Sequence, residues 1–106
     1  YYMPGSGLKW HNDRAHQKAF TFYCHQDWSP EWGGEFQTLD LKGEDKKMIW
    51  RVFDNKELFD AMINKGIGQF FHPKPNRLIV NSDIMHKINT TSTDSSPRLS
   101  LQGFIA

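Results

Sequence analysis

The sequence is poor in the features that would tie it to a membrane, to an oxidising compartment or to nucleic acid. Its 106 residues include one cysteine, Cys24, so no internal disulfide can form, and we expect a reducing, cytoplasmic location. Its apolar runs are far too short to span a bilayer. The net charge is +1 and the acids and bases are intermixed, which gives no broad field of one sign. Neither a membrane nor nucleic acid is therefore an expected partner.

What the chain does contain predicts a small β-rich domain. A chain of this length is expected to form a single domain, residues 1–106, with a hydrophobic core large enough to be stable without disulfides or a structural metal. Segments rich in aromatic and β-branched residues alternate with turn residues, and this pattern predicts short strands. The segments span residues 8–11, 19–24, 35–41, 48–53, 68–71, 77–81, 86–89 and 98–105. Many short strands separated by such turns indicate a sandwich or a barrel.

One segment has the periodicity of a helix. Asp54 is a suitable N-cap with Glu57 three residues later, and Gly66 is a suitable terminator. Between these positions the apolar residues recur at helical spacing. We predict a helix over residues 55–65, inserted between strands.

The most informative motif is the His-Asn-Asp triplet at residues 11–13, followed much later by His86 and Arg98. Two imidazoles and one carboxylate form the ligand set with which non-haem Fe(II) oxygenases hold iron while leaving coordination positions open. Arg98, on the predicted strand after that of His86, would supply a cation for an acidic cosubstrate. The triplet alone has low specificity, because a second His-x-Asp occurs at residues 25–27.

The order of the motifs supplies the missing specificity. Residues 2–13, which read Tyr-Met-Pro-Gly-Ser-Gly-Leu-Lys-Trp-His-Asn-Asp, resemble the opening of the prolyl 4-hydroxylase-like family of 2-oxoglutarate/Fe(II) dioxygenases. Residues 22–28, followed by Gly-Gly-Glu at 33–35, are similar to that family's Tyr-Leu-Asn…Trp…Gly-Gly-Glu segment. Residues 76–80, then His86, then residues 98–100 match its closing pattern. The resemblance spans nearly the whole chain in the family's order, and it places His25 where the family commonly has asparagine.

The resemblance implies an all-β fold, the double-stranded β-helix. This is a jelly-roll, cupin-like barrel of two facing antiparallel sheets, here with the one short helix as an insertion. The family usually places helices before the barrel, and the chain has no room for them ahead of Tyr1. We therefore expect that upstream helices are missing. A sheet face would then be open to a partner chain, as in a homo-oligomer.

The resemblance also implies the chemistry. His11, Asp13 and His86 would be the metal ligands and thus the catalytic residues, and Arg98 would bind the distal carboxylate of 2-oxoglutarate. The cofactors and cosubstrates would be Fe(II), 2-oxoglutarate and O2, with ascorbate as the reductant. The enzyme would hydroxylate a small molecule or a peptide and release succinate and carbon dioxide.

Two further residues are expected at the cosubstrate. If residues 98–105 form a strand, Ser100 shares a face with Arg98 because side chains alternate, so its hydroxyl could donate to the same carboxylate. Tyr2 matches a family tyrosine that lies near the cosubstrate. The remaining histidines are expected to be structural or solvent-facing; they are His16, His25 and His72.

Two alternative functions compete with the hydroxylase. One is a catalytically idle metal-binding or interaction module on the same barrel. The other is a nucleic-acid demethylating dioxygenase of the same superfamily, which usually carries a second arginine shortly after the cosubstrate-binding one. The sequence contains no arginine after Arg98, and its near-neutral charge also disfavours nucleic acid.

Overall fold

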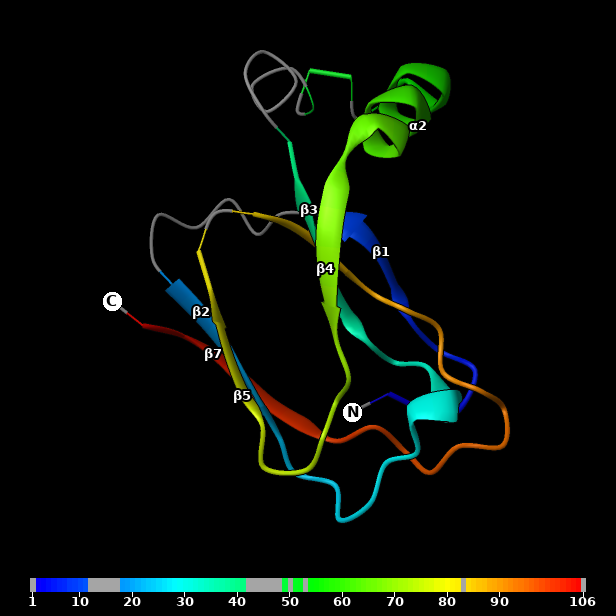
Figure 1. Ribbon diagram of the computed structural model, residues 1–106, viewed down its shortest axis with the longest axis vertical. Helices are drawn as coiled ribbons and strands as arrows, with labels where there is room; N and C mark the ends of the chain where they lie inside the picture. The colour runs from blue at the N-terminus through cyan, green and yellow to red at the C-terminus, as the bar shows by residue number, and fades with distance from the viewer. Residues whose placement is uncertain are drawn as a thin grey trace.

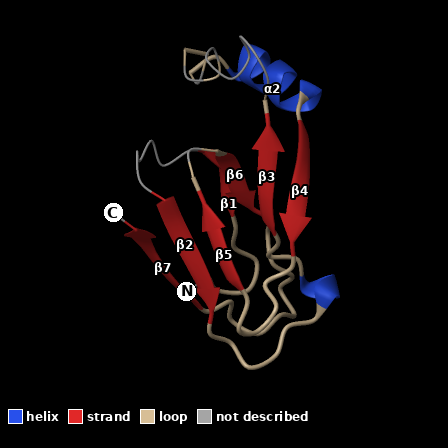
Figure 2. Ribbon diagram, turned by 60° about the vertical axis from the view of Figure 1, so that its left-hand side comes forward, coloured by secondary structure: helices blue, strands red, loops and turns tan. Residues whose placement is uncertain are grey.

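Two antiparallel sheets face each other, and one helix lies at the end of the larger sheet (Figures 1 and 2). The computed structural model describes residues 2–11, 18–41, 49, 51–52, 54–82 and 84–105. Within them the strands are β1 (Leu8–His11), β2 (Lys18–Tyr23), β3 (Phe36–Asp40), β4 (Ile67–Phe71), β5 (Leu78–Asn81), β6 (Met85–Ile88) and β7 (Ser100–Ile105). The helices are the 3-10 turn η1 (Pro30–Trp32) and the α-helix α2 (Lys56–Lys65).

The strand order is that of a jelly roll. The larger sheet has the order β1-β6-β3-β4, and the smaller has β5-β2-β7. Most connections, such as β1 to β2 and β6 to β7, cross from one sheet to the other. The predicted double-stranded β-helix with one inserted helix is thus confirmed.

The sequence alternates so that one face of each strand looks into the space between the sheets. In β2 the buried residues Thr21 and Tyr23 alternate with Phe20 and Phe22. Tyr23 is paired with Ser100 on β7, so these side chains share one face of the sheet. The opposite face of this sheet carries exposed leucines and other apolar residues; they are Leu78, Val80, Leu99, Leu101 and Ile105.

The main apolar core lies on the other face of the larger sheet, next to α2. Leu39 and Met85 are paired across β3 and β6, and both are buried. They pack with Leu41, Ile49 and Met62 of α2, and Trp10 covers the cluster from β1. Because side chains alternate along a strand, the neighbours of these residues, Thr38 and His86, face the space between the sheets.

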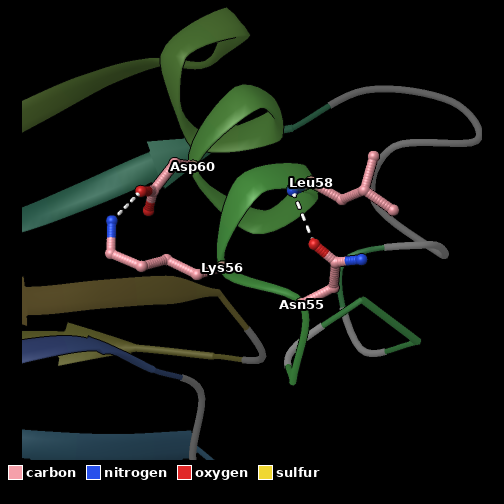
Figure 3. Close-up of polar contacts among 4 residues, drawn as sticks. All are labelled: Asn55, Lys56, Leu58 and Asp60. Atoms are coloured by element: carbon pink, nitrogen blue, oxygen red, sulfur yellow. Dashed lines mark hydrogen bonds and ion pairs between the residues drawn. The ribbon is translucent and has the colours of Figure 1, made fainter.

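The helix and its cap each begin one residue later than predicted. Its N-cap is Asn55, not Asp54, and the Asn55 side chain accepts a hydrogen bond of 3.2 Å from the backbone N–H of Leu58 (Figure 3). An Asn side chain at this position satisfies one of the N–H groups that a helix leaves without an internal partner. An exposed ion pair between Lys56 and Asp60, drawn in the same view, spans the first turn.

The predicted strand at residues 48–53 is wrong. Its described residues, Ile49, Arg51 and Val52, lie in turns. Ile49 is buried and Val52 packs against the same core cluster, so their apolar character comes from contact with α2 and not from strand pairing. The predicted strand at 98–105 is shorter, since β7 starts at Ser100 and Arg98 forms an isolated bridge with Tyr2.

Candidate metal and cosubstrate site

His11 and His86 meet across two neighbouring strands of the larger sheet. They are cross-strand partners, and their ring centroids lie 4.1 Å apart in an edge-to-face arrangement. The register between Leu8 and His11 shifts, because Leu8 pairs with Ile88 whereas His11 pairs with His86. Three residues of β1 thus advance against two of β6, which is the effect of a β-bulge. The extra residue allows both Leu8 and His11 to line the same cavity.

Backbone carbonyls select the tautomer of both imidazoles. His11 Nδ1 lies 2.8 Å from the oxygen of Lys9, and His86 Nδ1 lies 2.9 Å from the oxygen of Ile84. A carbonyl oxygen can only accept, so each Nδ1 carries the proton and each lone pair is on Nε2. Histidine ligands of metals are oriented in this way by a backbone acceptor on the second nitrogen. Phe36 stacks on His86 with centroids 5.3 Å apart, which restricts the ring further.

The third predicted ligand, Asp13, lies outside the described residues. Within the described part of the chain, no group of three His, Cys, Asp or Glu side chains could hold a metal. The structure therefore brings together two of the three predicted ligands, both imidazoles, a ligand type that suits iron and zinc.

A cavity of about 210 Å³ separates the two sheets beside the imidazoles. With about 30 Å³ for each molecule of liquid water, it has room for roughly seven waters or a small organic acid. The larger sheet contributes His11, His86 and Phe36. The smaller sheet contributes the polar side chains Thr21, Asn81 and Gln102.

Arg98 is fully buried and has no acidic partner among the described residues. Its Nε donates to the oxygen of Gly34 and its Nη2 donates to the hydroxyl of Tyr23, each at 3.1 Å. In the described structure its Nη1 is buried without a hydrogen-bond partner. Tyr2 and Tyr23 place their rings 5.1 and 4.9 Å from the guanidinium carbon. A buried cation that lacks a counter-charge is costly, so this position suits an incoming anion.

Burial shifts both ionisable groups of this pair away from their charged forms. It lowers the pKa of Arg98 and raises the pKa of Tyr23, while their mutual attraction opposes both shifts. Tyr23 therefore stays protonated near neutral pH and Arg98 stays charged, which gives one hydroxyl and one cation at the same place.

Arg98 does not line the cavity directly. The cross-strand pairs Thr21–Gln102 and Tyr23–Ser100 are successive rows on the inner face, about 7 Å apart. The cavity reaches the first row, and Arg98 lies beyond the second. A ligand that spans from the imidazoles to Arg98 must therefore pass Tyr23.

Tyr23 is a residue of the candidate site that the sequence motifs do not predict. Its hydroxyl accepts a hydrogen bond from Arg98 Nη2. Alternation along β2 places Tyr23 on the same face as Thr21, and this much can be read from the sequence. Its pairing with Ser100 depends on how the strands meet and cannot be read from the sequence. Tyr2 and Ser100 are the two further residues expected at the cosubstrate. The backbone N–H of Tyr2 donates to the oxygen of Arg98 at 2.8 Å, and the N–H of Arg98 donates to the oxygen of Tyr2 at 3.0 Å. Ser100 accepts a 3.4 Å hydrogen bond from Gln102.

The second His-x-Asp triplet has a different environment. His25 is 6% exposed, and both of its ring nitrogens contact backbone groups, those of Pro73 and Leu99. Asp27 is exposed. This use of both nitrogens is typical of a structural histidine. His72 is half-buried and His16 lies outside the described residues.

Comparison with known families gives the class of protein that the order of the sequence motifs indicated, a 2-oxoglutarate/Fe(II) oxygenase. The model of the 2OG-Fe(II) oxygenase superfamily matches residues 1–106, the whole sequence given. The chain belongs to this superfamily, and it is accordingly a dioxygenase-type oxidoreductase that depends on Fe(II), 2-oxoglutarate and O2. No curated protein and no solved structure matches the chain. Across the described residues, no helix has the length and apolarity required to cross a membrane.

Proposed function

We propose that the protein is a hydroxylase in which His11, Asp13 and His86 hold Fe(II), and Arg98 and Tyr23 hold the distal carboxylate of 2-oxoglutarate. The observation that carries the proposal is the buried guanidinium of Arg98, which has an unsatisfied Nη1 and no acidic partner in the described structure. The two imidazoles fit a divalent ion because their Nδ1 protons are already committed to backbone carbonyls.

The side chains around the cavity have separable tasks. The carbonyls of Lys9 and Ile84 keep the imidazole lone pairs on Nε2, and the Phe36 ring excludes water from one face of His86. Arg98 and Tyr23 orient the cosubstrate by charge and by hydrogen bonding. The chemistry that bound iron would supply is the O2-dependent oxidation that hydroxylates a C–H bond and converts 2-oxoglutarate to succinate and carbon dioxide.

A second cavity next to the first is the proposed place of the substrate. Its volume is about 280 Å³, and it shares Phe36 and Asn81 with the first cavity. Thr38, the cross-strand partner of His86, also lines it, as does Gln69, the partner of Thr38. The described residues that line it are all uncharged, with amide, hydroxyl and apolar groups. Such a lining suits a neutral substrate, for example a peptide segment of prolyl-hydroxylase type or a small uncharged molecule.

The reaction is tested by measuring succinate. The purified chain, supplied with Fe(II), ascorbate, 2-oxoglutarate and air, should release succinate, slowly without substrate and faster when a peptide or metabolite library contains one. Succinate at background in all of these conditions would refute the hydroxylase and favour an idle metal-binding module.

The ligand assignment is tested by metal binding. His11→Ala, Asp13→Ala and His86→Ala should each weaken binding of Mn(II) or Fe(II) strongly, since each removes one of three protein ligands. His25→Ala, which alters the other triplet, should retain metal binding. The reverse pattern would show that the wrong triplet was assigned.

A further inference from the structure

His25 lies at the junction of three segments that surround Arg98. It lies two residues after the end of β2 and is buried, and its ring is tilted against the rings of Tyr23 and Trp28, with centroids 5.7 and 4.8 Å away. Its Nε2 contacts the oxygen of Pro73, in the loop between β4 and β5. Its Nδ1 lies 3.2 Å from the backbone nitrogen of Leu99, the residue after Arg98.

The two backbone partners determine the protonation state of the ring. The oxygen of Pro73 can only accept, so Nε2 carries a proton, and the N–H of Leu99 can only donate, so Nδ1 must present its lone pair. Both bonds therefore exist only in the neutral ring. If Nδ1 also gained a proton, its N–H would face the N–H of Leu99, and two donors cannot form a hydrogen bond. The bond to Leu99 would therefore break.

The chain around Leu99 is held on both sides by the segment that carries His25. The N–H of Cys24 donates to the oxygen of Leu99 at 2.9 Å, while His25 accepts from its N–H. Both backbone polar groups of Leu99, the residue after Arg98, are thus hydrogen-bonded to Cys24 and His25, which directly follow the end of β2.

A second connection leads from His25 to the guanidinium itself. Trp28, whose ring is tilted against that of His25, donates its indole N–H to the oxygen of Gly33 at 3.0 Å. The next residue, Gly34, provides the carbonyl that accepts from Arg98 Nε. This contact is tight, since a Cβ on Gly34 would lie 3.1 Å from Trp28 and 3.2 Å from Arg98.

We infer that His25 is a positioning residue for the cosubstrate carboxylate: its neutral ring holds the Arg98 backbone, the Tyr23 ring and the Trp28–Gly34 contact in place, and its protonation releases Arg98. The inference rests on the proposed function and adds to it an acid-sensitive affinity for 2-oxoglutarate. The other titratable or charged side chains on the segments packed around His25 are Tyr2, Tyr23, Cys24, Asp27, Glu31, His72, Lys74, Arg77 and Arg98.

Two amide substitutions at residue 25 test the two hydrogen bonds of the His25 ring separately. In His25→Asn, Oδ1 occupies the place of Nδ1 and can accept from Leu99, whereas the bond to Pro73 is lost. In His25→Gln, the longer amide reaches the place of Nε2 and can donate to Pro73, whereas the bond to Leu99 is lost. Each variant is neutral and loses one hydrogen bond, so they differ mainly in which segment is released.

The first measurement is the Kd of 2-oxoglutarate by calorimetric titration, with Mn(II) as a metal that does not turn over. Near pH 7.5, His25→Asn should bind within about threefold of wild type, and His25→Gln about tenfold more weakly, the change that roughly 1.4 kcal/mol of lost interaction produces. Equal affinities of the two variants would overturn the inference even if both were less stable than wild type.

The second measurement is the pH dependence of the same Kd. As the pH is lowered from about 8 over the range in which the protein stays folded, the wild type should weaken about tenfold more than His25→Asn does, because only a histidine at this position can gain a proton. Both proteins keep His11 and His86, so any acid loss of the metal contributes equally to both. His72→Asn is the matched control and should retain the wild-type pH dependence. The same slope in wild type and His25→Asn would overturn the inference.

The third measurement needs neither metal nor cosubstrate. In the wild-type protein the amide resonance of Leu99 should move as the pH is lowered and the ring at residue 25 gains a proton, and in His25→Asn it should not. A Leu99 amide that ignores pH in wild type would overturn the inference while leaving the hydroxylase proposal intact. Failure of the wild type to bind 2-oxoglutarate at any pH would overturn both.

Discussion

Replacing Arg98 with methionine is the most direct test of how this site recognises its cosubstrate. Methionine is uncharged and similarly long, so it removes the buried cation with limited loss of volume. The guanidinium has one donor nitrogen without a partner in the described structure and a second that already bonds to Tyr23. One hydrogen bond to a charged group contributes roughly 1.5–3 kcal/mol, so the Kd of 2-oxoglutarate should rise roughly 10- to 150-fold.

A thermal-shift assay with Mn(II) measures this difference. At a 2-oxoglutarate concentration 100 times the wild-type Kd, ligand binding stabilises the wild type by about 2.7 kcal/mol. For a variant with a 100-fold higher Kd the gain falls to about 0.4 kcal/mol. In a domain of this size these values correspond to shifts in Tm of about 10–20 °C and about 2–3 °C.

The control variant is Arg98→Lys, which keeps the charge but offers no planar fork for Gly34 and Tyr23. Its ligand-induced shift should lie between those of wild type and Arg98→Met. A methionine variant with the full wild-type shift would show that the carboxylate binds elsewhere, and the reasoning from the buried cation would be refuted.

Three further changes test the fold and its titration. Gly68→Ala should lower the free energy of unfolding in a denaturant titration by about 1–3 kcal/mol, because the new Cβ would lie 1.8 Å from a backbone oxygen of β3; wild-type stability would contradict the register of β4. In the same assay Asn55→Ala should cost about 1 kcal/mol and Asp54→Ala less than about 0.5, and equal losses would refute the cap. Burial raises the pKa of Tyr23 in the folded state, so stability should fall as the pH rises above 10.0, where the unfolded tyrosine releases its proton first. Tyr23→Phe should flatten this alkaline slope, and an unchanged slope would assign it to other groups.

Most of the fold could be predicted because its strands alternate clearly and its turns carry glycine, proline or asparagine. The error at residues 48–53 has a physical cause. Ile49 and Val52 are apolar because they cover α2, and a short apolar run cannot by itself distinguish a strand from a buried turn. The sequence cannot decide between Asp54 and Asn55 as the helix cap because both residue types are good caps, and only the hydrogen bond from the Leu58 N–H to Asn55 distinguishes them.

The candidate site could be predicted only as far as local patterns reach. Alternation along residues 98–105 places Ser100 on the inner face with Arg98, and the pairing with Tyr23 agrees with this. The contact between Arg98 and the Tyr23 hydroxyl joins residues 75 positions apart, and no local pattern indicates it. The bulge that turns His11 toward His86 is likewise a property of strand pairing, which the sequence of β1 alone does not reveal.

The apolar cluster next to α2 and the cavity between the sheets lie on opposite faces of the larger sheet, and this affects how the protein can evolve. The cluster of Leu39, Met62 and Met85 lies on one side of the larger sheet, and the polar rows that face Thr38 and His86 lie on the other. Replacements in the hollow would therefore alter what the enzyme accepts while leaving its folding largely untouched. A scaffold of this kind can therefore change its substrate through a few inward positions while the apolar cluster that stabilises it stays the same.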